Sequence, residues 1–235
     1  MSSKVTTIGF DADDTLWHNA RFFQLTQARF ASILAPHCDV PDLMDALLQA
    51  EKRNIGRYGF GIKGFVLSMI ETALDVTKHQ VPGKVIAELI DAGKEMLAHP
   101  IELLPFAAEA VEAARSCGLA VLITKGDLLD QERKLAQSGL GDLFDGVEIV
   151  SAKIPSVYTR IFDQHGTGAA QGMMIGNSMK SDVNPMLDAG GWGIYVPHGQ
   201  HWEIEHAEPQ LGHPRYKEIK NLGALPSLIP KILQD

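Results

Sequence analysis

From about residue 100 the sequence alternates short apolar runs with amphipathic segments. The runs and the helical patterns between them are, in chain order, LAVLIT (119–124), 128–138, GVEIV (146–150), 156–165, GMMIG (172–176), 180–189 and GWGIYV (191–196). Short apolar runs that alternate with helices are typical of strands buried on both faces. This alternation predicts an α/β fold in which a parallel sheet is covered by helices on both faces.

The first strand of this sheet lies at the start of the chain and runs directly into acidic residues. The run VTTIGF (5–10) is apolar and β-branched, and Asp11, Asp13 and Asp14 follow within four residues. Like charges this close raise each other's cost of ionisation unless a positive group offsets them. Either the cluster is solvated, or a cation lies among the carboxylates.

Residues 18–99 have a largely helical pattern and interrupt the strand–helix alternation. We therefore expect a core domain of residues 1–17 and 100–235, with residues 18–99 inserted as a helical domain. Within the insertion, the segment NIGRYGFGIKG (54–64) carries four glycines, which predicts a connector or a loop that approaches a ligand. After residue 197 we expect irregular structure until a short helix near 226–233.

Composition excludes several classes of function. The net charge of −8 argues against nucleic acid or a membrane surface as the partner, since both require a basic face. The two cysteines, Cys38 and Cys117, lack metal-ligand spacing and favour a reducing compartment. The sequence shows no leader pattern and no apolar run of membrane-spanning length, so we expect a cytoplasmic protein.

Polar residues follow the predicted strands where a ligand would bind. In parallel sheets of this kind, ligands bind in the crevice beyond the carboxyl ends of the strands. The residues at or just after those ends are Asp11, Asp13, Thr124, Lys125, Ser151, Lys153, Asn177 and Asp182. Carboxylates, a hydroxyl group, lysines and a carboxamide are therefore expected at one edge of the sheet.

Four segments in this order resemble the motifs of the haloacid dehalogenase-like hydrolase superfamily. Asp11-x-Asp13-x-Thr15-Leu16 is similar to the first motif, and Thr124 at a strand end to the second. Lys153 before Pro155 resembles the third, and MMIGNSMKSDVNPMLDAG (173–190) the fourth. The resemblance implies a Rossmann-like core with an α-helical cap inserted between the first and second motifs. Such a cap closes over the site, and this favours a small substrate.

The resemblance and the chemistry of phosphate esters together predict a phosphatase. Asp11 is the expected nucleophile, which would form an aspartyl phosphate, and Asp13 is the expected acid and base. Mg²⁺ would bring the anionic nucleophile and the phosphate together. Its expected ligands are Asp11, the carbonyl group of Asp13, and Asn177 and Asp182 of the fourth motif. Thr124, Lys125 and Lys153 are expected to bind the phosphoryl oxygens.

One position departs from the family pattern. Asn177 stands where the superfamily usually has an aspartate, so the expected metal site loses one negative charge. An amide oxygen can still bind Mg²⁺. The departure therefore affects the expected metal affinity more than the expected reaction.

The substrate is expected to be a small phosphorylated metabolite, selected by the glycine-rich segment. Arg57, Tyr58 and Lys63 are the residues there that could contact it, although solvated charges are an equal alternative. A phosphomutase of the same superfamily and a non-catalytic binding module remain alternatives to the phosphatase. A 2-haloacid dehalogenase is disfavoured, since a halide leaves without a proton and would not use Asp13 as an acid.

Overall fold

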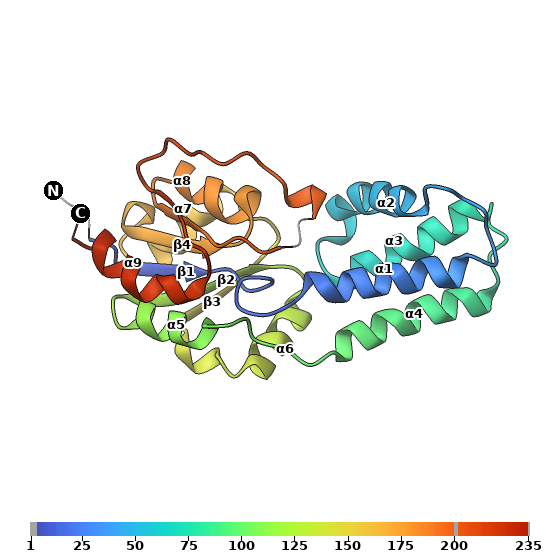
Figure 1. Ribbon diagram of the computed structural model, residues 1–235, viewed down its shortest axis with the longest axis horizontal. Coiled ribbons are helices and arrows are strands. Elements are labelled where there is room, and N and C mark those ends of the chain that lie inside the picture. Colours follow the sequence, from blue (N-terminus) through green and yellow to red (C-terminus); the bar gives the residue numbers. More distant parts are fainter. Residues whose placement is uncertain (1–3, 200–201, 235) are drawn as a thin grey trace. The chain divides into compact units, whose positions relative to one another are not determined.

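The computed structural model describes residues 4–199 and 202–234 and contains a parallel sheet (Figure 1). Among these residues the sheet has six strands in the order β3-β2-β1-β4-β5-β6, and every neighbouring pair is parallel. The strands are β1 (Thr7–Phe10), β2 (Leu119–Lys125), β3 (Gly146–Val150), β4 (Gly172–Gly176), β5 (Trp192–Tyr195) and β6 (Tyr216–Glu218). The predicted α/β fold is confirmed.

Different helices cover the two faces of the sheet, because side chains alternate along each strand. Leu122 of β2 packs in a core cluster with residues of α5 (Ala107–Arg115) and α9 (Leu225–Ile232). The next residue, Ile123, packs with residues of α7 (Pro155–Gln164) and α8 (Asn184–Asp188) on the opposite face. The helix α6 (Leu128–Ser138) contributes Leu135 to the first cluster. The predicted helical cover of both faces is therefore present.

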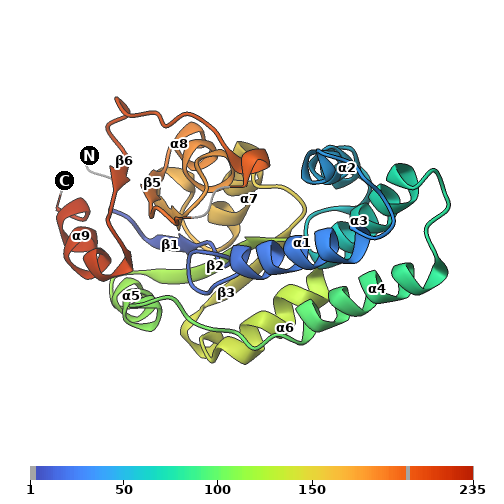
Figure 2. The ribbon, with the colours of Figure 1, turned by 45° about the vertical axis from the view of Figure 1, so that its right-hand side comes forward.

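Two segments near the C-terminus differ from the prediction. The tail was expected to be irregular, but Tyr216–Glu218 forms β6 beside β5, with Tyr195 opposite Glu218 (Figure 2). The sequence Tyr-Lys-Glu is too short and too polar to be recognised as a strand. The helix expected over 180–189 is split into a π-helical turn (Met179–Val183) and α8. Such turns are often found at functional sites.

The helical insertion follows β1 and consists of α1 (Ala20–Leu34), α2 (Leu43–Tyr58), α3 (Ile62–Val76) and α4 (Gly83–Ala98). Its own core is apolar and includes the buried side chains of Phe30, Phe65, Met69 and Leu89. Each helix contributes its apolar face to this core, which explains why marginal isolated helices are stable here.

The prediction of a loop over residues 54–64 is wrong. α2 continues to Tyr58 and α3 begins at Ile62, so only residues 59–61 connect the two helices. Gly59 (φ 75°) and Gly61 (φ 115°) have the positive φ angles that favour glycine and allow this short connection. Gly56 and Gly64 lie inside helices, where packing between α2 and α3 outweighs the low helix propensity of glycine.

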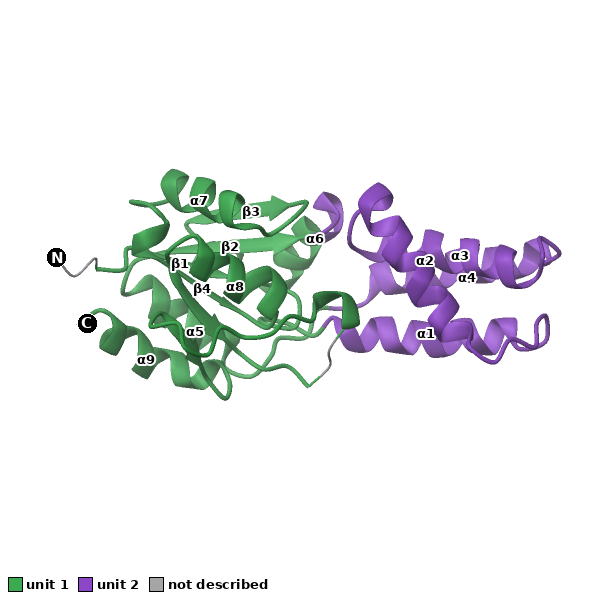
Figure 3. Ribbon diagram, turned by 90° about the horizontal axis from the view of Figure 1, so that it is seen from above, with its two compact units in different colours: residues 1–18, 101–125, 131–235 green, residues 19–100, 126–130 purple. Residues whose placement is uncertain are grey.

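The chain divides into two compact units (Figure 3). One contains Met1–His18, Ile101–Lys125 and Gln131–Asp235, and the other contains Asn19–Pro100 and Gly126–Asp130. The domain limits expected from the sequence stay a prediction. Among the described residues, no helix is both long and apolar enough to span a bilayer.

The helical insertion contains one buried carboxyl group. Glu51 of α2 is 6% exposed, and its Oε2 has no hydrogen-bond partner among the described residues. Burial raises the pKa of Glu51 from its ordinary value of 4.5 to about 7. Because the pKa is higher in the folded state, the neutral carboxyl group is the form that folding favours. Stability is therefore retained below pH 4.5 and decreases as the pH rises through 7.

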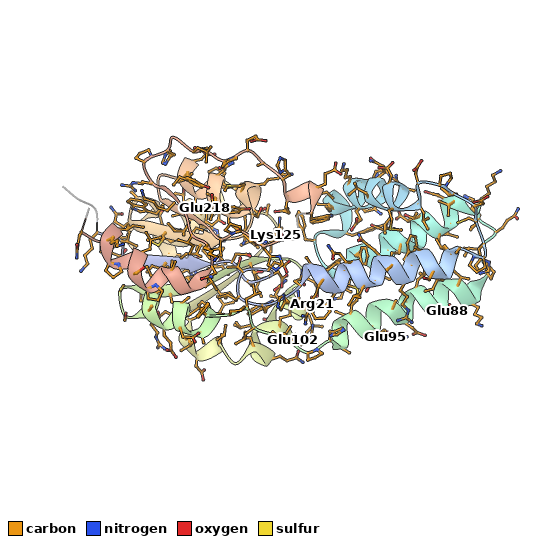
Figure 4. All side chains as sticks on the ribbon, in the orientation of Figure 1. Arg21, Glu88, Glu95, Glu102, Lys125 and Glu218 are labelled. Atoms are coloured by element: carbon orange, nitrogen blue, oxygen red, sulfur yellow. The ribbon has the colours of Figure 1, made fainter. Side chains whose placement is uncertain are left out.

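We expect Glu51→Gln to stabilise the protein at pH 8 and to leave its stability at pH 4 nearly unchanged. The gain at pH 8 should be roughly 1–3 kcal/mol, since each unit of pKa shift corresponds to about 1.4 kcal/mol. Urea unfolding at both pH values measures it. The control is Glu88→Gln on α4, an exposed site (Figure 4). An equal gain at both pH values would contradict the ionisation argument.

Candidate active site

The candidate site lies where the strand order reverses. From β1 the chain goes to β2 and β3 on one side and later to β4, β5 and β6 on the other. Asp11 follows β1, and its N–H donates to the carbonyl oxygen of Ile175 in β4 at 2.9 Å. Asn177 follows β4. The crevice between two such strands is the usual ligand site of a doubly wound sheet.

Lys153 lies between two buried carboxylates. Its ammonium group donates to Asp11 Oδ1 at 2.5 Å and to Asp182 Oδ1 at 2.7 Å, and its side chain is only 1% exposed. Burial by itself would lower the pKa of Lys153, but Asp11 and Asp182 raise it above its ordinary value. Lys153 is therefore charged, and it compensates two carboxylates that would otherwise repel each other.

Asp11 has a strongly altered proton affinity. Burial raises the pKa of the Asp11 carboxyl group to about 7, Asp182 adds to the rise, and Lys153 opposes it. Its second oxygen, Oδ2, accepts a hydrogen bond from Thr15 Oγ1 at 2.9 Å. Lys153 and Thr15 thus fix the two oxygens of Asp11 in direction, as a nucleophile requires.

The side-chain amide of Asn177 faces three oxygens. One of its two terminal atoms lies 3.2 Å from Asp11 Oδ2, 3.2 Å from Thr15 Oγ1 and 3.3 Å from the carbonyl oxygen of Asp13. A carbonyl oxygen and an ionised carboxylate oxygen only accept hydrogen bonds. The amide can satisfy them by presenting its nitrogen, or it can present its oxygen if a cation lies among the three groups. Hard cations such as Mg²⁺ prefer oxygen donors of this kind.

These oxygens fit a magnesium ion. Octahedral bonds of 2.0–2.1 Å place neighbouring oxygen ligands about 2.9 Å apart, close to the separations of the Asn177 amide from Asp11 and Asp13. A cation at this place would also favour the ionised form of Asp11. Three of the four predicted metal ligands are therefore brought together.

Asp182, the fourth predicted ligand, is held by other groups. Its Oδ1 accepts from Lys153, and its Oδ2 accepts from the N–H of Ser178 at 2.9 Å. The π-helical turn brings it against Gly176, where an added Cβ would lie 2.2 Å from Asp182 Oδ2. Glycine is thus required at 176 for this close approach. A metal-binding role for Asp182 stays a prediction.

Asp13 accepts hydrogen bonds from three side chains. Lys134 donates to both of its oxygens at 3.0 Å, Gln131 donates to Oδ2 at 2.9 Å, and Trp17 donates to Oδ1 at 2.8 Å. Burial would raise the pKa of Asp13, but Lys134, Gln131 and Trp17 hold it below its ordinary value. Asp13 is therefore a carboxylate here, whereas the sequence predicts that it acts as an acid.

Sequence reasoning missed Lys134 and Gln131 as partners of the site. Both are buried and lie three residues apart on α6, the helix that follows β2. The signal in the sequence was a pair of polar residues on one face of a helix that must cover the sheet. It does not show which group they meet.

The predicted phosphate-binding residues lie at the same edge. Thr124 is buried at the end of β2. Lys125 donates to Ser181 Oγ at 2.8 Å and forms an ion pair with Glu205 of the tail at 2.5 Å. Its ammonium group is thus already bound by a carboxylate that sequence reasoning did not consider.

The three residues expected to select the substrate lie in the helical insertion, and two of them already have partners, Tyr58 within the insertion and Lys63 in the segment after β2. Tyr58 donates to Glu71 Oε1 at 2.8 Å, and Lys63 pairs with Asp127 at 2.9 Å. Arg57 is exposed in the last turn of α2. Their role toward a substrate stays a prediction, and Tyr58 and Lys63 would have to leave these partners.

The chain resembles hydrolases of one superfamily over most of its length. A family model of haloacid dehalogenase-like hydrolases matches residues 5–190. A haloacid dehalogenase-like family hydrolase from Xanthomonas campestris has 38% sequence identity and a TM-score of 0.87, and the match covers 98% of this chain and 93% of that one. A comparison with curated proteins found no match.

Two other solved structures share the fold at low identity. A HAD-hydrolase from Bacillus subtilis bound to magnesium has 15% identity and a TM-score of 0.67, with 96% of this chain and 99% of that one covered. The L-2-haloacid dehalogenase from Xanthobacter autotrophicus has 16% identity and a TM-score of 0.66, and the match covers 96% of this chain and 98% of that one.

We expect Lys134→Met to destabilise the protein at pH 7 by about 2 kcal/mol, because it leaves the Asp13 carboxylate, whose side chain is only 22% exposed, without its cation. The pKa of Asp13 is lowered by folding, so the stability it contributes is present above its ordinary pKa of 3.8 and lost below it. The difference between the stability of the variant and that of the wild type should therefore persist from pH 7 to pH 4 and narrow only below pH 3.8 in urea unfolding.

The control is Lys84→Met, which removes an exposed lysine on α4 and should change stability by less than about 1 kcal/mol. A deficit for Lys134→Met that does not change with pH would mean that side-chain packing, and not the ion pair, is what was lost.

Proposed function

The chain belongs to the haloacid dehalogenase-like hydrolases, and we propose that it is a Mg²⁺-dependent phosphatase that acts on a small phosphorylated metabolite. The observation that supports this proposal best is the position of Asp11. Its carboxylate lies between the ammonium group of Lys153 and the side-chain amide of Asn177, and this amide also lies 3.3 Å from the carbonyl oxygen of Asp13. A nucleophilic oxygen, a cation for the phosphoryl group and a set of metal-binding oxygens therefore meet at one place.

The first step is attack by Asp11 on phosphorus. One carboxylate oxygen forms the new P–O bond, and the bond from phosphorus to the leaving oxygen breaks with its electron pair on that oxygen. Lys153 is placed to neutralise the charge on the phosphoryl oxygens during transfer. The product of this step is an aspartyl phosphate on Asp11.

Asp13 would serve both steps. In the first it gives a proton to the leaving oxygen, and in the second it takes one from the water that hydrolyses the aspartyl phosphate. Both of its oxygens accept hydrogen bonds here, so proton donation requires that Asp13 leave Lys134 and first take up a proton from solvent. As a carboxylate it is already in the form needed for the second step.

The metal would be held by Asp11 Oδ2, the carbonyl oxygen of Asp13 and the amide oxygen of Asn177. When bound, Mg²⁺ supplies positive charge that lets two anions approach each other. The Bacillus subtilis relative with bound magnesium supports this choice of ion.

A 2-haloacid dehalogenase is the second candidate. The observation that favours it is the low pKa of Asp13, because a halide leaves without a proton and only the ester hydrolysis needs a base. The fold is also shared with the Xanthobacter autotrophicus dehalogenase. Both candidates use Asp11 as the nucleophile, and they differ in substrate and in the need for Mg²⁺.

We expect purified protein to hydrolyse one or more members of a panel of small phosphomonoesters with MgCl₂, and to lose this activity in EDTA. Release of inorganic phosphate measures it, and 2-chloropropionate with detection of chloride is tested in parallel. Chloride release without phosphate release would replace the phosphatase by the dehalogenase. Release of neither product would favour a binding module.

Asp11→Asn should reduce the rate at least about a thousandfold, because an amide is a poor nucleophile. The matched control is Asp14→Asn in the same loop, since asparagine tolerates the positive φ of 63° at that position. Mass spectrometry of the quenched reaction should show a phosphoryl group on the wild type and none on Asp11→Asn. Near wild-type turnover in Asp11→Asn would exclude Asp11 as the nucleophile.

Asn177→Asp should make the protein more dependent on Mg²⁺ for stability. In EDTA the new carboxylate would lie 3.2 Å from Asp11 Oδ2, and the repulsion should lower Tm. With MgCl₂ the added charge should lower the dissociation constant for Mg²⁺ about tenfold. This effect is measured on stability and does not depend on the catalytic rate. Thermal unfolding against MgCl₂ concentration measures both effects.

The control is Asn221→Asp, because the side-chain oxygen of Asn221 accepts a hydrogen bond from Gly223 N–H and an aspartate can keep it. If Asn177→Asp leaves the Mg²⁺ dependence of Tm unchanged, residue 177 does not bind the metal.

A further inference from the structure

The C-terminal tail brings a carboxylate to the site. The family match ends at residue 190, and beyond it a short 3-10 helix (Glu203–Glu205) lies between β5 and β6 in the chain. The side chain of Glu205 is 18% exposed. It is therefore mostly withdrawn from solvent, which is unusual for a glutamate unless it is paired.

Glu205 is bound by a lysine and two serines, which we call the Lys–Ser cluster (Lys125, Ser178 and Ser181). Its Oε1 accepts from Lys125 Nζ at 2.5 Å. Its Oε2 accepts from Ser178 Oγ at 2.8 Å and from Ser181 Oγ at 2.5 Å. Three donors from two separate segments thus converge on one carboxylate.

Two hydrogen bonds besides those of Glu205 also attach the tail. Lys180 donates to the carbonyl oxygen of Ile204 at 2.7 Å, and Asn184 donates to that of Glu208 at 2.8 Å. These bonds hold the main chain on both sides of Glu205. The attachment of the tail therefore does not rest on the side chain of Glu205 alone.

The Lys–Ser cluster adjoins the residues that hold Asp11. Lys125 comes directly after Thr124 at the end of β2 (Figure 4), and Ser178 and Ser181 come from the segment that carries Asn177 and Asp182. The pKa of Lys125 is below its ordinary value, because burial and the charge of Lys153 lower it more than the charge of Glu205 raises it. Ser178 of the cluster also donates its N–H to Asp182 Oδ2 at 2.9 Å, and Asp182 accepts a hydrogen bond from Lys153, the lysine that contacts Asp11.

An ammonium group and two hydroxyl groups bind phosphate oxygens as readily as carboxylate oxygens. We propose that the Lys–Ser cluster is an anion subsite, and that Glu205 occupies it and competes with the anionic group of the substrate or product. The inference rests on the proposed function. Glu205 then limits the affinity for phosphate and favours release of the product.

The test is equilibrium binding of inorganic phosphate, measured by calorimetry on the full-length protein. Glu205→Gln keeps the shape of the side chain but removes the competing charge, and it should tighten phosphate binding about fivefold or more. Glu208→Gln, an exposed glutamate of the same tail, should leave binding unchanged. In a Lys125→Met background, Glu205→Gln should change binding less than about twofold.

Unchanged or weaker phosphate binding in Glu205→Gln would overturn the inference and make Glu205 an anchor of the tail. If Glu205→Gln does not fold, Glu205→Asp decides, since its shorter side chain should give an intermediate tightening. Failure of both variants to fold would also identify a structural anchor. Turnover of the phosphomonoester panel is measured separately, so loss of this inference is distinct from loss of the proposed function.

Discussion

One buried ammonium group, that of Lys153, is the interaction on which the candidate site depends. It lies between Asp11 and Asp182, two carboxylates that could not both remain ionised in a buried place without it. The π-helical turn and the absence of a side chain at Gly176 both support this interaction, because they allow the carboxylate of Asp182 to reach Lys153. Asp11, the proposed nucleophile, is therefore held in a three-member charge arrangement drawn from segments after β1, β3 and β4.

The two aspartates of the first motif are only two residues apart, yet the structure gives them opposite properties. Asp11 shares its lysine with Asp182 and has a raised pKa, whereas Asp13 has Lys134 together with two neutral donors and has a lowered one. The neighbouring groups explain the difference, because burial and Asp182 raise the pKa of Asp11, whereas Lys134, Gln131 and Trp17 lower that of Asp13. A pair of acids with separated pKa values is the arrangement that acid–base chemistry requires.

The fold could be predicted to a large extent because it follows from hydrophobic periodicity. Buried strands and amphipathic helices alternate visibly from residue 100 onward, and parallel strands bring their carboxyl ends to one edge. The two wrong predictions, a loop over residues 54–64 and an irregular tail, arose where local composition did not indicate the secondary structure. Glycines in residues 54–64 were interpreted as a loop, although packing keeps Gly56 and Gly64 helical. The strand β6 was missed because three polar residues at a sheet edge carry no periodic signal.

By itself the sequence determined the parallel sheet, the helical insertion and the presence of Asp11, Asp13, Lys153 and Asn177 at one edge. Only the tertiary structure decided which polar groups meet. Lys134 lies 121 residues from Asp13, and Glu205 lies 80 residues from Lys125. Periodicity specifies which face of an element is buried, but it does not specify the partner of a buried charge. That choice depends on the packing of whole elements against each other, so the charge pairs became visible only with the fold.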